Sequence, residues 1–376
     1  MKIAKIVSII PVFLCAASLD LFGQSGPTAD GIRNITVADA LADSLLRSYS
    51  VDELLRFKSF YEDERAQLEK ERLLLREKGI RDLEAFLRNH PESTVLDKVI
   101  FRLAELYYEQ AENDYLTAQE AYSQALEKFD AGELQALPPE PKKDFSTTLA
   151  LYRRIIDDFP RSTLQDDAHY GIAFITEDMQ QREAAIALYE KFLQAFPESR
   201  YAPDVLMRQA EYYFNPPQNN TDKAIEIYNK VLAYTDSPKF NEALYKLGWS
   251  YYKLSDYPKA ISYFTMLADD INRAADFDPA SKVSNPALRE ESIEYIGISF
   301  LDYTGAEGAE EYLAKIGGRE YGVDILRKIG DSYMNVKEDY DKAIYAYEVL
   351  LRLYPFAPEA PLAQAKIAEA HRFLED

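Results

Sequence analysis

The chain has 376 residues, of which 47% are hydrophobic, and a formal net charge of -21 from 43 basic and 64 acidic side chains. The hydrophobic content is enough for a sizeable core, but the acidic charge repels phosphate backbones and no basic stripe interrupts it. Nucleic acid is therefore excluded as an expected partner. The single cysteine also excludes an intramolecular disulfide.

The N-terminus has the layout of a secretory signal peptide. Lys2 and Lys5 precede an apolar run over residues 6–17, and small residues follow that run. An apolar run of this length is too short to span a bilayer as a helix. We therefore predict a signal peptide over residues 1–23. Its removal would place an exported protein in the periplasm or at the periphery of the outer membrane.

The only cysteine, Cys15, lies at the edge of the apolar run. A bacterial lipoprotein has small residues just before its lipidated cysteine, whereas Phe13 and Leu14 stand here, which argues against lipid anchoring through Cys15. Residues 24–50 are predicted to form a linker, since the first part of this stretch mixes Gly, Pro, Ser and Thr with no period.

Residues 51–90 are predicted to form one long N-terminal helix that joins a degenerate repeat. Apolar side chains gather near its start, and a charged run follows over residues 62–72. One interpretation is a solvated helix face with ion pairs between successive turns. The other is a coiled-coil dimerisation arm, but Leu68, Leu75 and Leu83 do not sustain three clean heptads.

From about residue 91 onward, a pair of short amphipathic helices recurs along the chain, and residues 242–268 hold the clearest copy. Leu247, Gly248 and Tyr251 share a face of the first helix, and Ala260 and Phe264 mark a face of the second. Small residues belong at such contacts, because larger ones would hold the backbones apart. The positions predicted to pack between helices are Ala173, Ala185, Ala210, Ala224, Gly248, Tyr251, Ala260, Phe264, Gly297, Gly330 and Ala343.

This pattern resembles the tetratricopeptide repeat, in which W-x2-L-G-x2-Y is followed by A-x3-F and a proline over about 34 residues. Leu244 stands at the place of the tryptophan in residues 242–268. The resemblance implies an all-α fold, namely a right-handed superhelical solenoid of antiparallel helix pairs over residues 91–376, preceded by the long N-terminal helix.

Two segments interrupt the expected solenoid. Residues 109–144 form an insertion with an extra helical stretch and a proline-rich loop, which either packs on its own repeat or contacts a partner. Residues 269–286 are predicted to form an irregular loop. Its aspartates lack the order of a calcium-binding loop, which favours a solvated acidic loop. The last helix is either a cap or the start of a further repeat.

The sequence carries no catalytic, cofactor or metal signature. The histidines His90, His169 and His371 have no second ligand at metal spacing, and HExxH is absent. Neither a G-x-S-x-G elbow nor a Gly-rich phosphate loop occurs. We therefore expect a non-enzymatic protein with no cofactor.

Aromatic residues are abundant, with 28 Tyr, 19 Phe and one Trp. In tetratricopeptide repeats, positions two, five, nine, twelve and thirteen of the first helix face the concave surface. The resemblance thus implies a groove lined by Tyr108, Tyr170, Phe174, Met207, Phe214, Tyr245, Trp249 and Tyr252. Acidic residues lie between them, and such a groove suits an extended or helical peptide that carries Lys or Arg. The same rings would also serve to pack neighbouring helices, and both interpretations stay open.

The sequence therefore predicts a protein-binding scaffold of the bacterial cell envelope, with a protein or peptide partner of basic character and an association with the outer membrane through partners. In pattern the repeats are similar to envelope proteins of Gram-negative bacteria, including the lipoprotein of outer-membrane barrel assembly and the periplasmic coordinator of the Tol–Pal system. The alternative is a peptidoglycan enzyme or accessory factor with a helical solenoid, similar to lytic transglycosylases. No compact catalytic domain fits in the residues outside the repeats.

Overall fold

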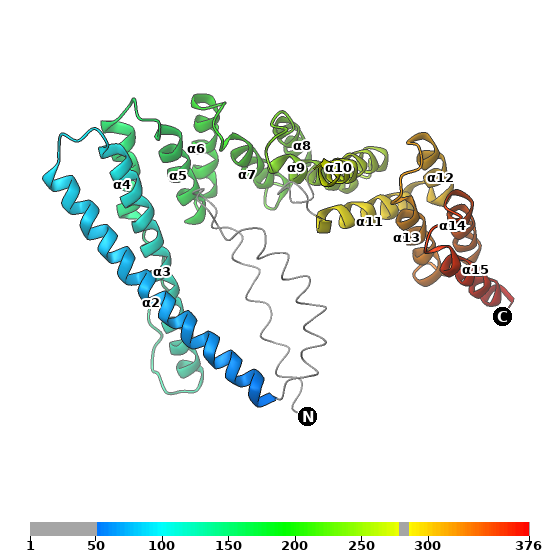
Figure 1. Cartoon of the computed structure of the whole chain (residues 1–376), viewed down its shortest axis with the longest axis horizontal. Helices are drawn as coiled ribbons and strands as arrows, with labels where there is room; N and C mark the ends of the chain where they lie inside the picture. Colours follow the sequence, from blue (N-terminus) through cyan, green and yellow to red (C-terminus); the bar gives the residue numbers. More distant parts are fainter. Residues whose placement is uncertain (1–50, 278–285, 376) are drawn as a thin grey trace. The chain divides into compact units, whose positions relative to one another are not determined.

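The computed structural model describes residues 51–277 and 286–375, and these residues form helices and turns with no strand (Figure 1). The predicted signal peptide, linker and Cys15 lie outside the described residues. The helices are α2 (Val51–Asn89), α3 (Leu96–Asp130), α4 (Ser146–Asp158), α5 (Gln165–Asp178), α6 (Arg182–Ala195), α7 (Ala202–Phe214), α8 (Thr221–Val231), α9 (Lys239–Lys253), α10 (Tyr257–Phe277), α11 (Pro286–Tyr303), α12 (Gly305–Lys315), α13 (Gly322–Asn335), α14 (Tyr340–Leu353) and α15 (Ala360–Glu375).

The chain divides into two units, residues 1–72 and 73–376. In the first unit, the side chains of residues 55–72 on α2 are exposed, and Lys58 pairs with Glu62 one turn later at 3.6 Å. This arrangement matches the solvated face with ion pairs. None of the described helices is both long enough and apolar enough to cross a membrane.

In the second unit, each helix from α3 onward packs on its neighbours in the chain. The odd-numbered helices from α3 to α15 are the first helices of their pairs, and the even-numbered ones from α4 to α14 are the second. The first helices α7, α9, α11 and α13 also contact one another in succession. The prediction of an all-α solenoid of helix pairs is therefore confirmed.

The core repeats one arrangement, in which an aromatic ring of the second helix meets a small residue of a first helix. A Cβ added to Gly248 would lie 2.6 Å from the Phe264 ring, and one added to Gly330 would lie 2.7 Å from the Tyr347 ring. Glycine is required at both places because a real Cβ cannot come so close. Second-helix rings that are 2% exposed or less include Tyr152, Tyr189, Tyr228, Phe264 and Tyr347.

The positions predicted to pack between helices are buried, with two departures from the expected contacts. Tyr251 is only half-buried and stacks on Tyr263 with ring centroids 5.4 Å apart, so it does not fill the core as predicted. Gly297 lies against Lys328 of α13, whose Cβ would be 3.2 Å from an added Cβ, and not against a ring of α12.

The turns within several helix pairs share a left-handed backbone conformation that the residue types do not predict. Gln180, Asn219, Ser255 and Glu338 each have a positive φ, between 45° and 63°, two residues before a second helix starts. This left-handed conformation is usually taken by glycine. Three of the helices that follow are capped by side chains, since Asn220, Asp256 and Asp339 accept hydrogen bonds from backbone N–H groups three residues later.

The prediction of an irregular loop over residues 269–286 is wrong for its first part, because residues 269–277 continue α10. The apolar period extends through Ile271, which is 2% exposed and packs with Leu244 and Leu267. Asp269 accepts hydrogen bonds from Arg319 Nη2 at 2.9 Å and from Tyr321 Oη at 2.8 Å, so it joins two repeats. Residues 278–285 lie outside the described part of the chain, and within that part no group of metal-ligating side chains could hold an ion.

Candidate protein-binding site

The predicted groove residues lie on the first helices α3, α5, α7 and α9. We call the surface formed by positions two, five, nine, twelve and thirteen of the first helices from α3 to α13 the first-helix face. The structure does not leave all of its aromatic residues open. Tyr170 and Met207 are buried, at 4% and 3% exposed, which contradicts their assignment to an open groove. The half-buried members are Tyr108, Phe174, Phe214, Tyr245, Trp249 and Tyr252.

Tyr170 is buried by a residue outside the repeat motif. Its ring stacks on Tyr201 with centroids 4.2 Å apart and planes 6° from parallel, and its hydroxyl donates to Asp204 Oδ2 at 2.7 Å. Tyr201 directly precedes α7, so the turn between two repeats covers the ring. At this place the packing interpretation of the aromatic residues holds.

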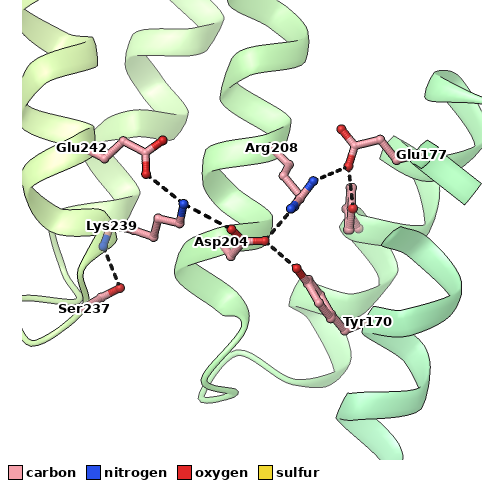
Figure 2. A network of polar contacts seen from close by, with 8 residues as sticks. Tyr170, Glu177, Asp204, Arg208, Ser237, Lys239 and Glu242 are labelled. Atoms are coloured by element: carbon pink, nitrogen blue, oxygen red, sulfur yellow. Dashed lines mark hydrogen bonds and ion pairs between the residues drawn. The ribbon is translucent and has the colours of Figure 1, made fainter. Parts of the chain in front are cut away.

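Asp204 lies at the centre of a polar network that joins α5, α7 and α9 (Figure 2). Arg208 donates from Nε to Asp204 Oδ2 at 2.7 Å and from Nη1 to Glu177 Oε2 at 2.9 Å. Lys239 Nζ lies 3.5 Å from Asp204 Oδ1 and 2.8 Å from Glu242 Oε2. The acidic side chains that the sequence placed in the groove are thus paired here with basic side chains of the same chain.

The network keeps its central groups charged. Burial disfavours the carboxylate of Asp204, but the charge of Arg208 and the hydrogen bond from Tyr170 outweigh burial and hold the pKa of Asp204 below its usual range. The pKa of Arg208 is raised, because Asp204 and its other neighbours more than offset the effect of burial. This part of the face is a preformed ionic contact between repeats.

The insertion covers the first-helix face at α3 and α5. α3 continues through Asp130, and the returning segment brings Lys143 to 2.8 Å from both Glu112 Oε1 and Asp178 Oδ2. Phe145 from the same segment stacks on Tyr108 with ring centroids 5.1 Å apart. The insertion therefore packs on its own repeats, and Tyr108 is covered where an open groove position was predicted.

Basic side chains of the chain also cover two further rings of the predicted groove. The guanidinium of Arg208 lies 4.7 Å from the centroid of Phe174, and Lys253 Nζ lies 4.5 Å from the centroid of Phe214. Both distances suit a cation–π contact. A partner would have to displace these cations to reach either ring.

A different arrangement lies between α9 and α11, where four half-buried rings meet. We call them the Trp249 cluster, and its members are Tyr245, Trp249, Tyr252 and Tyr295. The Trp249 and Tyr295 centroids are 4.3 Å apart, and those of Trp249 and Tyr252 are 5.8 Å apart. The next repeat therefore covers part of Trp249, which was predicted to face the open groove, and leaves part of it accessible.

Two carboxylates of α11 flank the cluster. Tyr245 donates its hydroxyl to Glu291, and Tyr252 donates to Asp302 Oδ2 at 2.8 Å. Burial, together with the hydrogen bond to the acceptor carboxylate, raises the pKa of each tyrosine to about 12. Both hydroxyls therefore remain protonated donors at neutral pH.

A surface pocket of about 650 Å³ lies between α11 and α13, and Glu294 of its lining directly precedes Tyr295 of the cluster in the sequence. The residues that line it are Arg289, Glu290, Ile293, Glu294, Asp324, Arg327, Lys328, Asp331, Ser332, Asn335 and Val336. None of the predicted groove residues lines this pocket. With Gly330 at position eight of the repeat, Asp324, Arg327, Asp331 and Asn335 occupy positions two, five, nine and thirteen, so the same rule applied to polar residues would have found the pocket.

Comparisons with known proteins agree with this architecture. A family model described as a tetratricopeptide repeat matches residues 218–279, and a second with the same description matches residues 167–199 and 324–357. No curated protein sequence matches the chain.

Among solved structures, YrrB, a tetratricopeptide-repeat protein with an unusual peptide-binding site, is 17% identical over 57% of this chain and 97% of its own, with a TM-score of 0.32. The C-terminal part of a repeat-containing protein from Cytophaga hutchinsonii is 18% identical over 77% of this chain and 96% of its own, with a TM-score of 0.35. PilF of Pseudomonas aeruginosa is 18% identical over 67% of this chain and 99% of its own, with a TM-score of 0.32. The matched segments, residues 167–199, 218–279 and 324–357, are similar to tetratricopeptide repeats.

Proposed function

We propose that this protein is a non-enzymatic scaffold that binds a protein or peptide segment on the first-helix face, along α9, α11 and α13. The observation that carries the proposal is the pocket between α11 and α13, which combines side chains of both charges with the apolar Ile293 and Val336 and shares α11 with Tyr295 of the Trp249 cluster. Interfaces concentrate their affinity at such partly exposed aromatic and arginine side chains. The rings on α3, α5 and α7 are covered by the chain itself, which directs a partner to the later repeats.

The proposal includes a place in the bacterial cell envelope and a partner segment of basic character. Export is supported by the layout of the N-terminus, and a basic partner by the formal net charge of -21. Partners would also provide the association with the outer membrane. Nothing in the described residues favours the alternative of a peptidoglycan enzyme.

A random 12-residue peptide display library, selected on the full chain, tests the scaffold proposal. We expect enriched peptides that crosslink to the protein when a photoreactive amino acid replaces Asn335, which lines the pocket. The matched control places the same photoreactive group at Lys191, an exposed residue of the second helix α6. Failure to enrich any peptide, or crosslinking that is as strong from Lys191 as from Asn335, would contradict binding on the first-helix face.

Export makes a separate prediction about the mature N-terminus. Because Lys2 and Lys5 precede an apolar run that ends at Ala17, we expect the mature protein to begin between Ser18 and Ser25. Mass spectrometry of the protein from the envelope fraction of a Gram-negative host measures this directly. Recovery of the chain with Met1 intact from that fraction would contradict export by a cleaved signal peptide.

A further inference from the structure

One position of the first helices carries a cation in most of the repeats from α7 to α13. It lies two residues before the small residue that packs between helices, and it is occupied by Arg208 before Ala210, Lys246 before Gly248, and Lys328 before Gly330. On α11 the equivalent residue, before Gly297, is Tyr295. The row of cations is therefore interrupted at α11.

Each of these cations contacts the preceding first helix. Arg208 of α7 lies over Phe174 of α5 at 4.7 Å from the ring centroid. Lys246 of α9 lies 2.9 Å from Glu211 Oε1 of α7, and Lys328 of α13 pairs with Glu294 of α11. The residue at this position thus places a positive charge on the first-helix face of the preceding repeat.

A second position also differs between α9 and α11. Lys253 lies five residues after Gly248 and places its Nζ 4.5 Å from the centroid of Phe214 on α7. Five residues after Gly297 stands Asp302, which accepts a hydrogen bond from Tyr252 of α9. The contact between α7 and α9 thus has Lys253 over the ring of Phe214. The equivalent contact between α9 and α11 has the carboxylate of Asp302 beside the ring of Tyr252.

The inner packing changes with these substitutions. In three other repeats, a buried tyrosine of the second helix donates to a carboxylate of the first. These hydrogen bonds run from Tyr189 to Glu177 at 2.7 Å, from Tyr228 to Glu211 at 2.6 Å and from Tyr347 to Asp331 at 2.6 Å. In the pair α9 and α10, Trp249 follows the small Gly248, at the position where Glu211 follows Ala210 on α7. The buried ring of this pair is Phe264, which has no hydroxyl to donate. The hydrogen bond of the other repeats is replaced by an apolar contact beneath the Trp249 cluster.

The Trp249 cluster is therefore half-buried and differs from the rings of the neighbouring repeats. Among residues 51–277 and 286–375, no Lys or Arg side chain lies over any of its rings. Glu291 and Asp302 stand beside it, and Lys337 Nζ lies 3.9 Å from Asp302 Oδ1. Tryptophan is the aromatic side chain that attracts cations best, and a nearby carboxylate adds to that attraction.

We propose that a Lys or Arg side chain of the partner segment binds on the accessible part of Trp249, between Glu291 and Asp302, and so supplies the positive charge that the chain itself supplies at the neighbouring repeats. This inference rests on the proposed scaffold function and names the chemistry of its partner. The contact of Arg208 with Phe174, with Asp204 and Glu177 beside it, is the template within the same chain.

The test uses the full chain and the fluorescence of Trp249, which is its only tryptophan. The probes are the decapeptides (Gly-Lys)5 and (Gly-Arg)5, with (Gly-Gln)5 as the uncharged control. We expect the basic peptides alone to change the emission of Trp249 saturably. Tyr295→Arg is designed to place a cation of the chain over Trp249, and we expect it to weaken the binding of the basic peptides at least tenfold.

Two controls separate this site from the general attraction of an acidic protein for basic peptides. Tyr61→Arg makes the same change of residue and charge on α2, where the side chain is 64% exposed, and should weaken binding by less than twofold. Asp302→Asn keeps the shape of the side chain and should weaken binding at least threefold, which covers the case in which Tyr295→Arg does not fold. Folding of each variant is checked by circular dichroism.

Two results would overturn the inference, namely unchanged emission of Trp249 at saturating basic peptide, or equal affinities for the unmodified chain, Tyr295→Arg and Asp302→Asn. The scaffold proposal would survive either result if library peptides still crosslinked from Asn335. If no library peptide bound the face while the decapeptides behaved as expected, the cation site would stand and the wider scaffold proposal would fall.

Discussion

Phe264→Ala is expected to lower the free energy of unfolding of the repeats around it by about 4 kcal/mol, within the range for removing a fully buried aromatic side chain. Phe264 is 0% exposed, lies against Gly248, and has the rings of Tyr245 and Tyr295 at centroid distances of 6.1 Å and 5.7 Å. Its loss would leave a cavity that two helix pairs share. Because a solenoid can unfold in parts, unfolding in urea is best followed by the emission of Trp249, which reports on this region.

Tyr251→Ala is the matched control on the same helix pair. Tyr251 is half-buried and stacks on Tyr263, so its removal leaves a space that water can enter and should cost less than half as much. Equal losses of stability in the two variants would show that the Phe264 contact is not the core of this pair.

A size exchange tests the contact between the two helices more directly. Gly248→Leu alone should overpack the pair and cost about 1 to 3 kcal/mol, since even a Cβ would lie 2.6 Å from the ring. In the double variant with Phe264→Ala, the leucine enters the vacated space. We therefore expect the double variant to lose less stability than the sum of the two single variants, and a strictly additive loss would contradict the contact.

The repeat contacts could be predicted from the sequence because burial imposes the periodicity. A small residue that accepts a ring at every pair leaves a pattern in the residue types, as Gly248 and Phe264 show. The left-handed turns leave none, because Ser255 and Glu338 are not residues that mark a positive φ. The continuation of α10 was missed because its aspartates suggested a loop, although the apolar spacing extends to Ile271.

The candidate site was predicted less completely, for a physical reason. The repeat motif identifies which positions face a surface, but the exposure of a ring depends on residues outside the motif. Tyr201 from a turn covers Tyr170, and Phe145, which directly follows the insertion, stacks on Tyr108. The pocket between α11 and α13 was missed because its groove positions are polar, as Asp331 is, and the prediction selected mainly aromatic residues.

Arg208→Gln is expected to cost about 3 kcal/mol at pH 7, the low end of the range for removing one partner of a buried ion pair. The side chains of Arg208 and Asp204 are 28% and 22% exposed, so water recovers part of the lost interaction. Without the guanidinium, Asp204 keeps only the hydroxyl of Tyr170 and the more distant Lys239 as partners in the network, and Glu177 loses its cation. Arg154→Gln is the control, because its ion pair with Asp158 is exposed and should contribute within about 0.5 kcal/mol.

The dependence of this loss on pH identifies its cause. Since the pKa of Asp204 is lower in the folded chain than in the unfolded one, its ionisation stabilises the fold above the unfolded value of about 4, and this stabilisation disappears as the pH falls through the folded pKa. A protonated Asp204 gains little from Arg208. The difference in stability between the unmodified chain and Arg208→Gln should therefore be full at pH 7 and shrink below about pH 4, as measured by urea unfolding across that range. A difference that stays constant from pH 7 to pH 3 would show that Arg208 stabilises the repeats by packing on Phe174 and not by its charge.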